Sequence, residues 1–145
     1  MLPGISGFDS MRAVAEDDEV GLPIMGHPAL LGSFVTAKEQ GISHGVLFGE
    51  LMRIAGADIG IFPNFGGRFS FSKDECKEIA LAGSSKLSNI KPLWLSPAGG
   101  MTLDRIGDMI DFYGKDTASL IGGALHRGDL YENSLAMVQK IESLS

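Results

Sequence analysis

Short apolar runs alternate with segments of helical periodicity along this chain. The runs occupy residues 22–25, 57–62, 91–95 and 118–121. Each is close to continuous in apolar residues, which is typical of parallel strands covered on both faces. Between the runs, apolar positions recur at the spacing of one helix face, most clearly over 102–114. Four strand–helix units in succession favour a parallel sheet and an α/β fold.

Polar residues and glycines mark where the predicted helices begin and end. Ser72 and Glu75 have the spacing of a capping box and predict a helix that stops at Gly83. Gly114 is predicted to end the helix of the following unit. The predicted caps of the other helices are Asp9, Ser43, Thr102 and Asn133.

Two glycine pairs, Gly99-Gly100 and Gly122-Gly123, follow the third and fourth apolar runs. Glycine lets the backbone come close to a ligand, and free N–H groups at the start of a helix bind anions. Two such turns in succession at the end of an α/β chain predict a barrel whose last two βα loops hold one phosphate. Ser96 is predicted either to donate its hydroxyl to that anion or to bond the backbone.

Basic side chains follow the other predicted strand ends. His27 is predicted either to face a ligand or to be hydrogen-bonded within its loop. Arg68 lies in a loop with a glycine pair and three phenylalanines, which predicts a mobile loop that closes over a ligand. Its guanidinium would pair with phosphate or carboxylate, unless the arginine is merely exposed on a turn. His126 and Arg127 follow the second glycine pair, and either is predicted to reach the anion or to make a turn or subunit contact.

Composition narrows the classes of partner. The net charge of −6 argues against nucleic acid or an anionic membrane as the main partner. No apolar run approaches the roughly 20 residues of a membrane span. The single cysteine, Cys76, excludes a disulfide framework and a cysteine metal cluster, and it fits a reducing, cytoplasmic setting. We therefore expect a cytoplasmic protein that binds a small molecule and has no metal site in this segment.

Taken in order, these motifs resemble the C-terminal half of the RuBisCO large-subunit superfamily, specifically its RuBisCO-like (form IV) branch. The matching stretches are 26–30, 41–47, 56–58 with the loop to Arg68, 96–100 and 122–128. The resemblance covers residues 1–145 and implies strands five to eight of a (β/α)8 barrel, with the N-terminal domain and the first barrel strands absent. It also implies a homodimer, and Mg²⁺ held by ligands outside this chain.

The resemblance implies roles for particular residues. One substrate phosphate would be held by Ala98, Gly99, Gly100, Gly122 and Gly123. His27 replaces an arginine that contacts the second phosphate in carboxylases, and Arg68 replaces the loop-six lysine that steadies CO2. Ile61 stands where carboxylases have a substrate-binding histidine. These changes argue against CO2 fixation on ribulose bisphosphate.

Two functional hypotheses follow. The favoured one is an enzyme that acts on a phosphorylated keto-sugar or keto-acid through a Mg-stabilised enolate, by enolisation, isomerisation or decarboxylation. The alternative is a non-catalytic, phosphate-binding half-barrel that self-associates. Under either hypothesis the chain alone is expected to be inactive and to associate, because four parallel strands leave two open edges.

Overall fold

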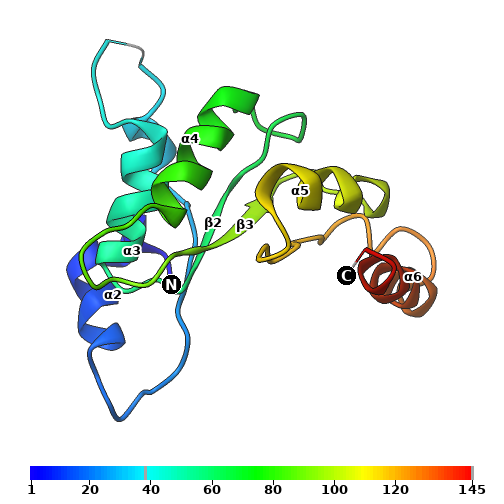
Figure 1. Cartoon of the computed structure of the whole chain (residues 1–145), viewed down its shortest axis with the longest axis horizontal. Helices are drawn as coiled ribbons and strands as arrows, with labels where there is room; N and C mark the ends of the chain where they lie inside the picture. Colours follow the sequence, from blue (N-terminus) through cyan, green and yellow to red (C-terminus); the bar gives the residue numbers. More distant parts are fainter. Residues whose placement is uncertain (38, 145) are drawn as a thin grey trace.

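A three-stranded parallel sheet forms the centre of the chain (Figure 1). The computed structural model describes residues 1–37 and 39–144. The strands, in order across the sheet, are β1 (Met25–Gly26), β2 (Ile59–Pro63) and β3 (Trp94–Ala98). The register pairs Met25 with Ile59 and Ile61 with Ser96. Three of the predicted strands are therefore confirmed, each overlapping its apolar run.

Helices cover one side of this sheet, and the last two helices lie beyond it at the C-terminal end of the chain. In chain order they are α1 (Pro3–Ser6), α2 (Phe8–Ala15), the 3-10 turn η1 (Gly32–Phe34), the π-helix η2 (Gly45–Leu51) continuing into α3 (Met52–Ile54), α4 (Lys73–Ser84), the 3-10 turn η3 (Leu103–Arg105), α5 (Ile106–Tyr113) and α6 (Leu130–Glu142). In Figure 1, η2 and α4 lie side by side against the sheet, whereas α5 and α6 lie past β3. None of the helices in the described residues is long and apolar enough to cross a membrane.

The prediction of a regular strand at the fourth apolar run, residues 118–121, is wrong. The run joins the sheet through one parallel bridge, between Thr117 and Leu95, where the N–H of Ala118 donates to the Leu95 carbonyl at 2.8 Å. A parallel ladder would next need the N–H of residue 97 to donate to the Ala118 carbonyl. Pro97 has no N–H, so the hydroxyl of Ser96 donates to that carbonyl instead, at 3.0 Å. The pairing therefore stops after one step.

The predicted helix caps are partly confirmed. Ser72 and Glu75 form the capping box at the start of α4, with side-chain to backbone distances of 3.2 and 2.7 Å. The prediction for the last helix is wrong, because Asp129 caps α6 by accepting a hydrogen bond from the N–H of Glu132 at 3.0 Å. Asn133 lies within the first turn of α6, where its amide is used to bond the preceding loop.

Other helix ends show similar small shifts. Gly114 ends α5 with a φ of 92°, as predicted. Thr102 precedes η3 without a side-chain capping bond, and α5 begins later, at Ile106. The Ser43 hydroxyl accepts from the N–H of Val46 at 3.3 Å, which is the contact expected of a cap. Asp9 lies in the first turn of α2, after the cap residue.

Two apolar clusters fill the interior. The larger lies between the sheet and the helices η2 and α4, and includes Phe48, Phe62, Ile79 and Leu95. The helices approach closely there, since a Cβ on Gly49 would lie 2.7 Å from the Cβ of Ala82. The smaller cluster, Met101, Ile106, Met109 and Ile121, joins α5 to the segment between β3 and α6. The residues after β3 are thus packed around a second centre, which holds the glycine turns in place.

Candidate functional site at the glycine turns

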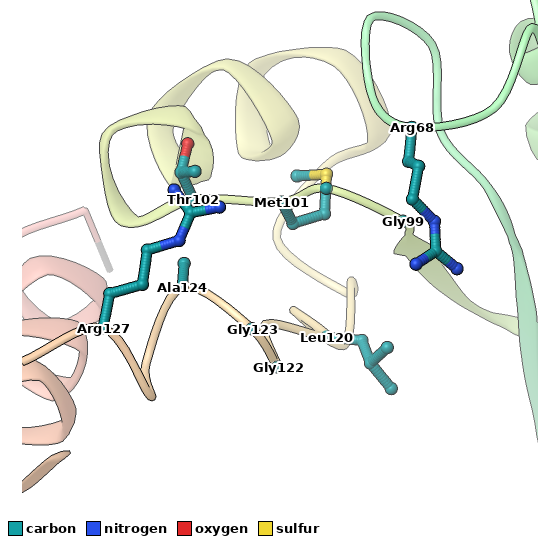
Figure 2. Close-up of a pocket in the computed structure, with 10 residues that line it drawn as sticks. Arg68, Gly99, Met101, Thr102, Leu120, Gly122, Gly123, Ala124 and Arg127 are labelled. Carbon is teal, nitrogen blue, oxygen red and sulfur yellow. The ribbon is translucent and has the colours of Figure 1, made fainter.

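The two glycine pairs meet at one cavity of about 350 Å³ (Figure 2). Its lining consists of both pairs with Arg68, Met101, Thr102, Leu120, Ala124 and Arg127. We call this space the glycine cavity. The predicted convergence of the two turns is therefore observed, although the segments are more than twenty residues apart in sequence.

The two pairs differ in what they demand of the backbone. Gly99 and Gly100 have φ values of 89° and 80°, which other residues rarely adopt. A Cβ on Gly99 would also lie 2.7 Å from the ring of Phe69. Gly122 and Gly123 have no such φ, and a Cβ on either would meet nothing within 4 Å. Packing therefore requires glycine at the first pair, whereas at the second pair the missing side chains only keep space open.

The backbone donors of these turns are uncommitted. Within residues 1–37 and 39–144, the N–H groups of Gly99, Gly100, Gly122 and Gly123 donate no hydrogen bond. Gly99 is partly buried, whereas Gly100, Gly122 and Gly123 are exposed, so these N–H groups are open to water or to a ligand. Four uncommitted donors around one cavity match the requirements of an anion.

The loop after β2, residues 64–71, is fastened onto the first glycine pair. The N–H of Arg68 donates to the Gly99 carbonyl at 2.9 Å. From the other side, the Arg105 guanidinium donates to the carbonyls of Phe65 and Gly66 at 2.9 and 3.1 Å. This loop, which we call loop six, thus forms a wall of the glycine cavity.

Loop six starts from a buried polar residue that the sequence analysis did not select. Asn64 is fully buried, and its Oδ1 accepts a hydrogen bond from the Tyr113 hydroxyl at 2.6 Å. Its Nδ2 faces the sulfur atoms of Met101 and Met109 at 3.3 and 2.9 Å. Burial raises the pKa of the Tyr113 hydroxyl, and the pKa of the neighbouring Cys76 thiol for the same reason. The signal in the sequence was a polar residue directly after a buried strand.

A second, larger cavity of about 710 Å³ adjoins the first. Three residues, Arg68, Gly99 and Leu120, line both spaces. The rest of its lining is mostly apolar and includes Leu30, Phe48, Ile61, Phe62, Phe69, Phe71 and Ala98. We call it the apolar cavity.

His27 lines the apolar cavity, and its Nδ1 accepts a hydrogen bond from the N–H of Ala29 at 3.1 Å. Both interpretations of this histidine are therefore compatible, since it is bonded within its loop and also faces a cavity. The bond at Nδ1 leaves the Nε2 atom for another partner.

Three of the predicted site residues are placed elsewhere. Ser96 is fully buried, and its hydroxyl bonds the Ala118 carbonyl, as its second interpretation predicted. His126 is exposed and lines neither cavity, whereas its neighbour Arg127 lines the glycine cavity. Ala98 lines the apolar cavity instead of the glycine cavity. The structure thus brings together the four glycines and Arg68, with His27 one cavity away.

The carboxylates are not arranged around these cavities. The described residues contain no group of three or more His, Cys, Asp or Glu side chains that could hold a metal ion. Asp58, at the opposite end of β2, accepts a hydrogen bond from the N–H of Ile24 at 2.7 Å, so it ties β1 to β2.

Fold and site together define a class of protein. Parallel strands with helices on one face, and cavities at the carboxyl ends of those strands, are the arrangement of a (β/α)8 barrel, in which active sites lie at that end. The chain contributes the C-terminal part of such a barrel.

Comparison with known proteins identifies the family. No family model matches the chain. It is 38% identical over 125 residues to ribulose bisphosphate carboxylase-like protein 1 of Rhodopseudomonas palustris, covering 86% of this chain and 32% of that protein. It is 35% identical over 120 residues to the 2,3-diketo-5-methylthiopentyl-1-phosphate enolase of Bacillus cereus, covering 83% of this chain and 29% of the enzyme.

Solved structures agree with these relatives. A Rubisco-like protein from R. palustris superposes with a TM-score of 0.82 at 32% identity, over 98% of this chain and 37% of that one. A Rubisco-like protein (MtnW) from Alicyclobacillus acidocaldarius gives 0.87 at 28% identity, over 96% and 35%. An octameric RuBisCO from Pyrococcus horikoshii gives 0.80 at 25% identity, over 97% and 34%.

The chain belongs to the RuBisCO large-subunit superfamily, in its RuBisCO-like branch. It spans about a third of the length of the relatives that it matches, in their C-terminal part.

Proposed function

We propose that this chain forms the phosphate-anchoring side of a RuBisCO-like active site that acts on a phosphorylated keto-sugar or keto-acid through an enolate. The observation that carries the proposal is the glycine cavity, where four uncommitted backbone N–H groups and the side chain of Arg68 line one space. The relatives include enolases whose substrate is a diketo phosphate, which supports the same class of substrate here.

The adjoining cavities suggest how such a substrate lies. The phosphate would occupy the glycine cavity, and the carbon skeleton would pass Arg68, Gly99 and Leu120 into the apolar cavity. The second space is lined mostly by apolar side chains, including Ile61 and two phenylalanines of loop six, and its basic groups are His27 and Arg68. A second phosphate would therefore lose hydration there and gain few donors in return. A bisphosphate is therefore a poor substrate in this proposal, and CO2 fixation on it is not expected.

The chemistry of an enolate requires groups beyond those described here. The proposal includes Mg²⁺ held by ligands outside this chain. The described residues contain no group of three or more His, Cys, Asp or Glu side chains that could hold a metal ion. The proposed contribution of the 145 residues is to bind and orient the substrate, and no catalytic step is assigned to them. The chain by itself is expected to show no turnover.

The non-catalytic alternative is not favoured, since the named relatives include enzymes. Self-association belongs to both hypotheses, and we propose it here as well. The support is apolar surface in the described residues, such as Leu22 at 72% exposure, and the octameric assembly of one structural neighbour.

Binding of methyl phosphate to the chain, followed by isothermal titration calorimetry, tests the anchor. Gly122→Val places a side chain in the glycine cavity without a steric clash at its Cβ, so it should abolish binding and leave the melting temperature nearly unchanged. Each hydrogen bond to the charged phosphate is worth about 1.5–3 kcal/mol. Losing two of them would weaken the affinity by more than about a hundredfold.

The matched control adds the same side chain elsewhere. Gly107 lies in α5 and lines neither cavity, and a Cβ added there would have only Leu144 as a neighbour, at 4.0 Å. Gly107→Val should bind methyl phosphate as the natural chain does. Unchanged affinity in Gly122→Val, with the fold intact, would refute the proposed anchor.

A further inference from the structure

The five arginines of this chain divide into two groups. Three have partners. Arg12 pairs with Glu16 at 2.8 Å, Arg105 donates to loop-six carbonyls, and the buried Arg53 donates to four backbone carbonyls at 2.6–3.3 Å. The remaining two, Arg68 and Arg127, form no side-chain hydrogen bond or ion pair with any described residue, although the Arg68 guanidinium lies over the ring of Phe69, 4.9 Å from its centroid.

Both unpaired arginines line the glycine cavity. In Figure 2, Arg68 and Arg127 extend from opposite sides of the space, with Gly122 and Gly123 between them. None of the described residues that line the cavity is acidic. In a chain of net charge −6, a place with two cations, free N–H groups and no carboxylate is a local concentration of positive potential.

The backbone that carries Arg127 is fixed from outside the cavity. The side-chain amide of Asn133, in the first turn of α6, donates to the carbonyls of Leu125 and Arg127 at 3.0 and 2.9 Å. The turn is thereby bonded to a helix, so the arginine starts from a defined position. The same two bonds flank His126, whose side chain does not line the cavity.

We propose that Arg127 is a specificity-determining residue that makes the glycine cavity select a dianionic phosphomonoester over a monoanion of similar shape. This inference rests on the proposed phosphate anchor and adds to it the charge state of the ligand. Neutral N–H donors accommodate either anion, whereas each guanidinium forms a charge-assisted contact that strengthens with the charge on the phosphate. Arg68 reaches the ligand from loop six, and Arg127 reaches it from the turn before α6.

The test compares two probes at about pH 8, where a phosphomonoester is fully charged because its second pKa is about 6. Methyl phosphate is then a dianion, and dimethyl phosphate is a monoanion with the same tetrahedral centre. The natural chain should prefer methyl phosphate. Arg127→Gln should weaken methyl phosphate binding about tenfold and change dimethyl phosphate binding less, so that the preference falls. Arg127→Lys should restore part of it.

His126→Gln is the matched control, since it changes the adjacent exposed residue and should keep both affinities. An unchanged preference in Arg127→Gln, while Gly122→Val still abolishes binding, would overturn the role of Arg127 and leave the anchor intact. An equal loss in His126→Gln would also overturn it, by assigning the effect to the turn. Failure of the natural chain to bind methyl phosphate would refute both the anchor and this inference.

Discussion

Replacing Tyr113 by phenylalanine should destabilise the base of loop six. Its hydroxyl is 2.6 Å from Oδ1 of the fully buried Asn64, and this oxygen accepts a hydrogen bond from no other donor among the described residues. Tyr113→Phe therefore leaves a buried carbonyl oxygen unpaired, at a cost of about 1–3 kcal/mol. For a domain of this size each kcal/mol corresponds to about 2–4 °C in melting temperature.

A double-mutant cycle separates the hydrogen bond from the general loss of packing. Asn64→Leu removes the buried amide and places an apolar side chain beside the sulfur atoms of Met101 and Met109. Once the amide has been removed, loss of the Tyr113 hydroxyl leaves no carbonyl oxygen unpaired. Replacing both hydrogen-bonding partners by apolar groups can leave the unfolding free energy nearly unchanged. The double variant should therefore be more stable than the sum of the single effects predicts, by about 1 kcal/mol or more.

Urea unfolding, followed by circular dichroism and by the fluorescence of the single tryptophan, Trp94, measures all four corners of this cycle. Agreement between the two signals would support a cooperative transition. Additive effects of Asn64→Leu and Tyr113→Phe, within about 0.5 kcal/mol, would refute the claim that the bond between these side chains holds the loop.

Three further predictions concern pH, the first glycine pair and assembly. The unfolding free energy should fall as the pH rises above about 8.5, the ordinary pKa of cysteine. Burial raises the pKa of Cys76 and Tyr113 in the folded chain, so above this pH the unfolded chain releases their protons first; a urea series up to about pH 10 measures this, and a flat profile would contradict it. Gly99→Ala should lower stability by at least about 1 kcal/mol, because of its φ of 89° and the ring of Phe69, whereas Gly122→Ala should change it by less than about 0.5 kcal/mol; thermal melts compare the two. Light scattering at micromolar concentration should give a mass above the 15.4 kDa of one chain, and a stable monomer would argue against self-association.

The alternation of apolar runs and helical segments was enough to predict the parallel sheet, because buried parallel strands have few polar positions. It failed at the fourth strand for a reason outside that strand. The run at 118–121 has the right composition, but its neighbour β3 contains Pro97, which lacks the N–H needed to continue the ladder. A pattern within one segment does not report what the adjacent strand can donate.

The site was predictable to the extent that its parts are local. Glycine pairs after strands indicate turns wherever they occur, and both pairs lie at the cavity. The choice between His126 and Arg127 was not predictable, because it depends on how the turn before α6 is oriented. The side-chain amide of Asn133 bonds two carbonyls of that turn, and the sequence pattern suggested a different role for it, as a helix cap. A side chain that forms hydrogen bonds to backbone groups outside its own helix leaves no periodic signal in the sequence.

The two glycine pairs look alike in sequence but are subject to different physical constraints. Gly99 and Gly100 adopt left-handed conformations and touch loop six, so substitution there would change the fold before it changed any ligand. Gly122 and Gly123 have ordinary backbone conformations and open space where a side chain would lie, so packing gives no reason for glycine at either position. Glycine costs conformational entropy on folding, and no contact among residues 1–37 and 39–144 offsets that cost at the second pair. The remaining physical reason is the cavity itself, which a side chain at Gly122 or Gly123 would fill. The second pair is therefore the better place to separate binding from stability.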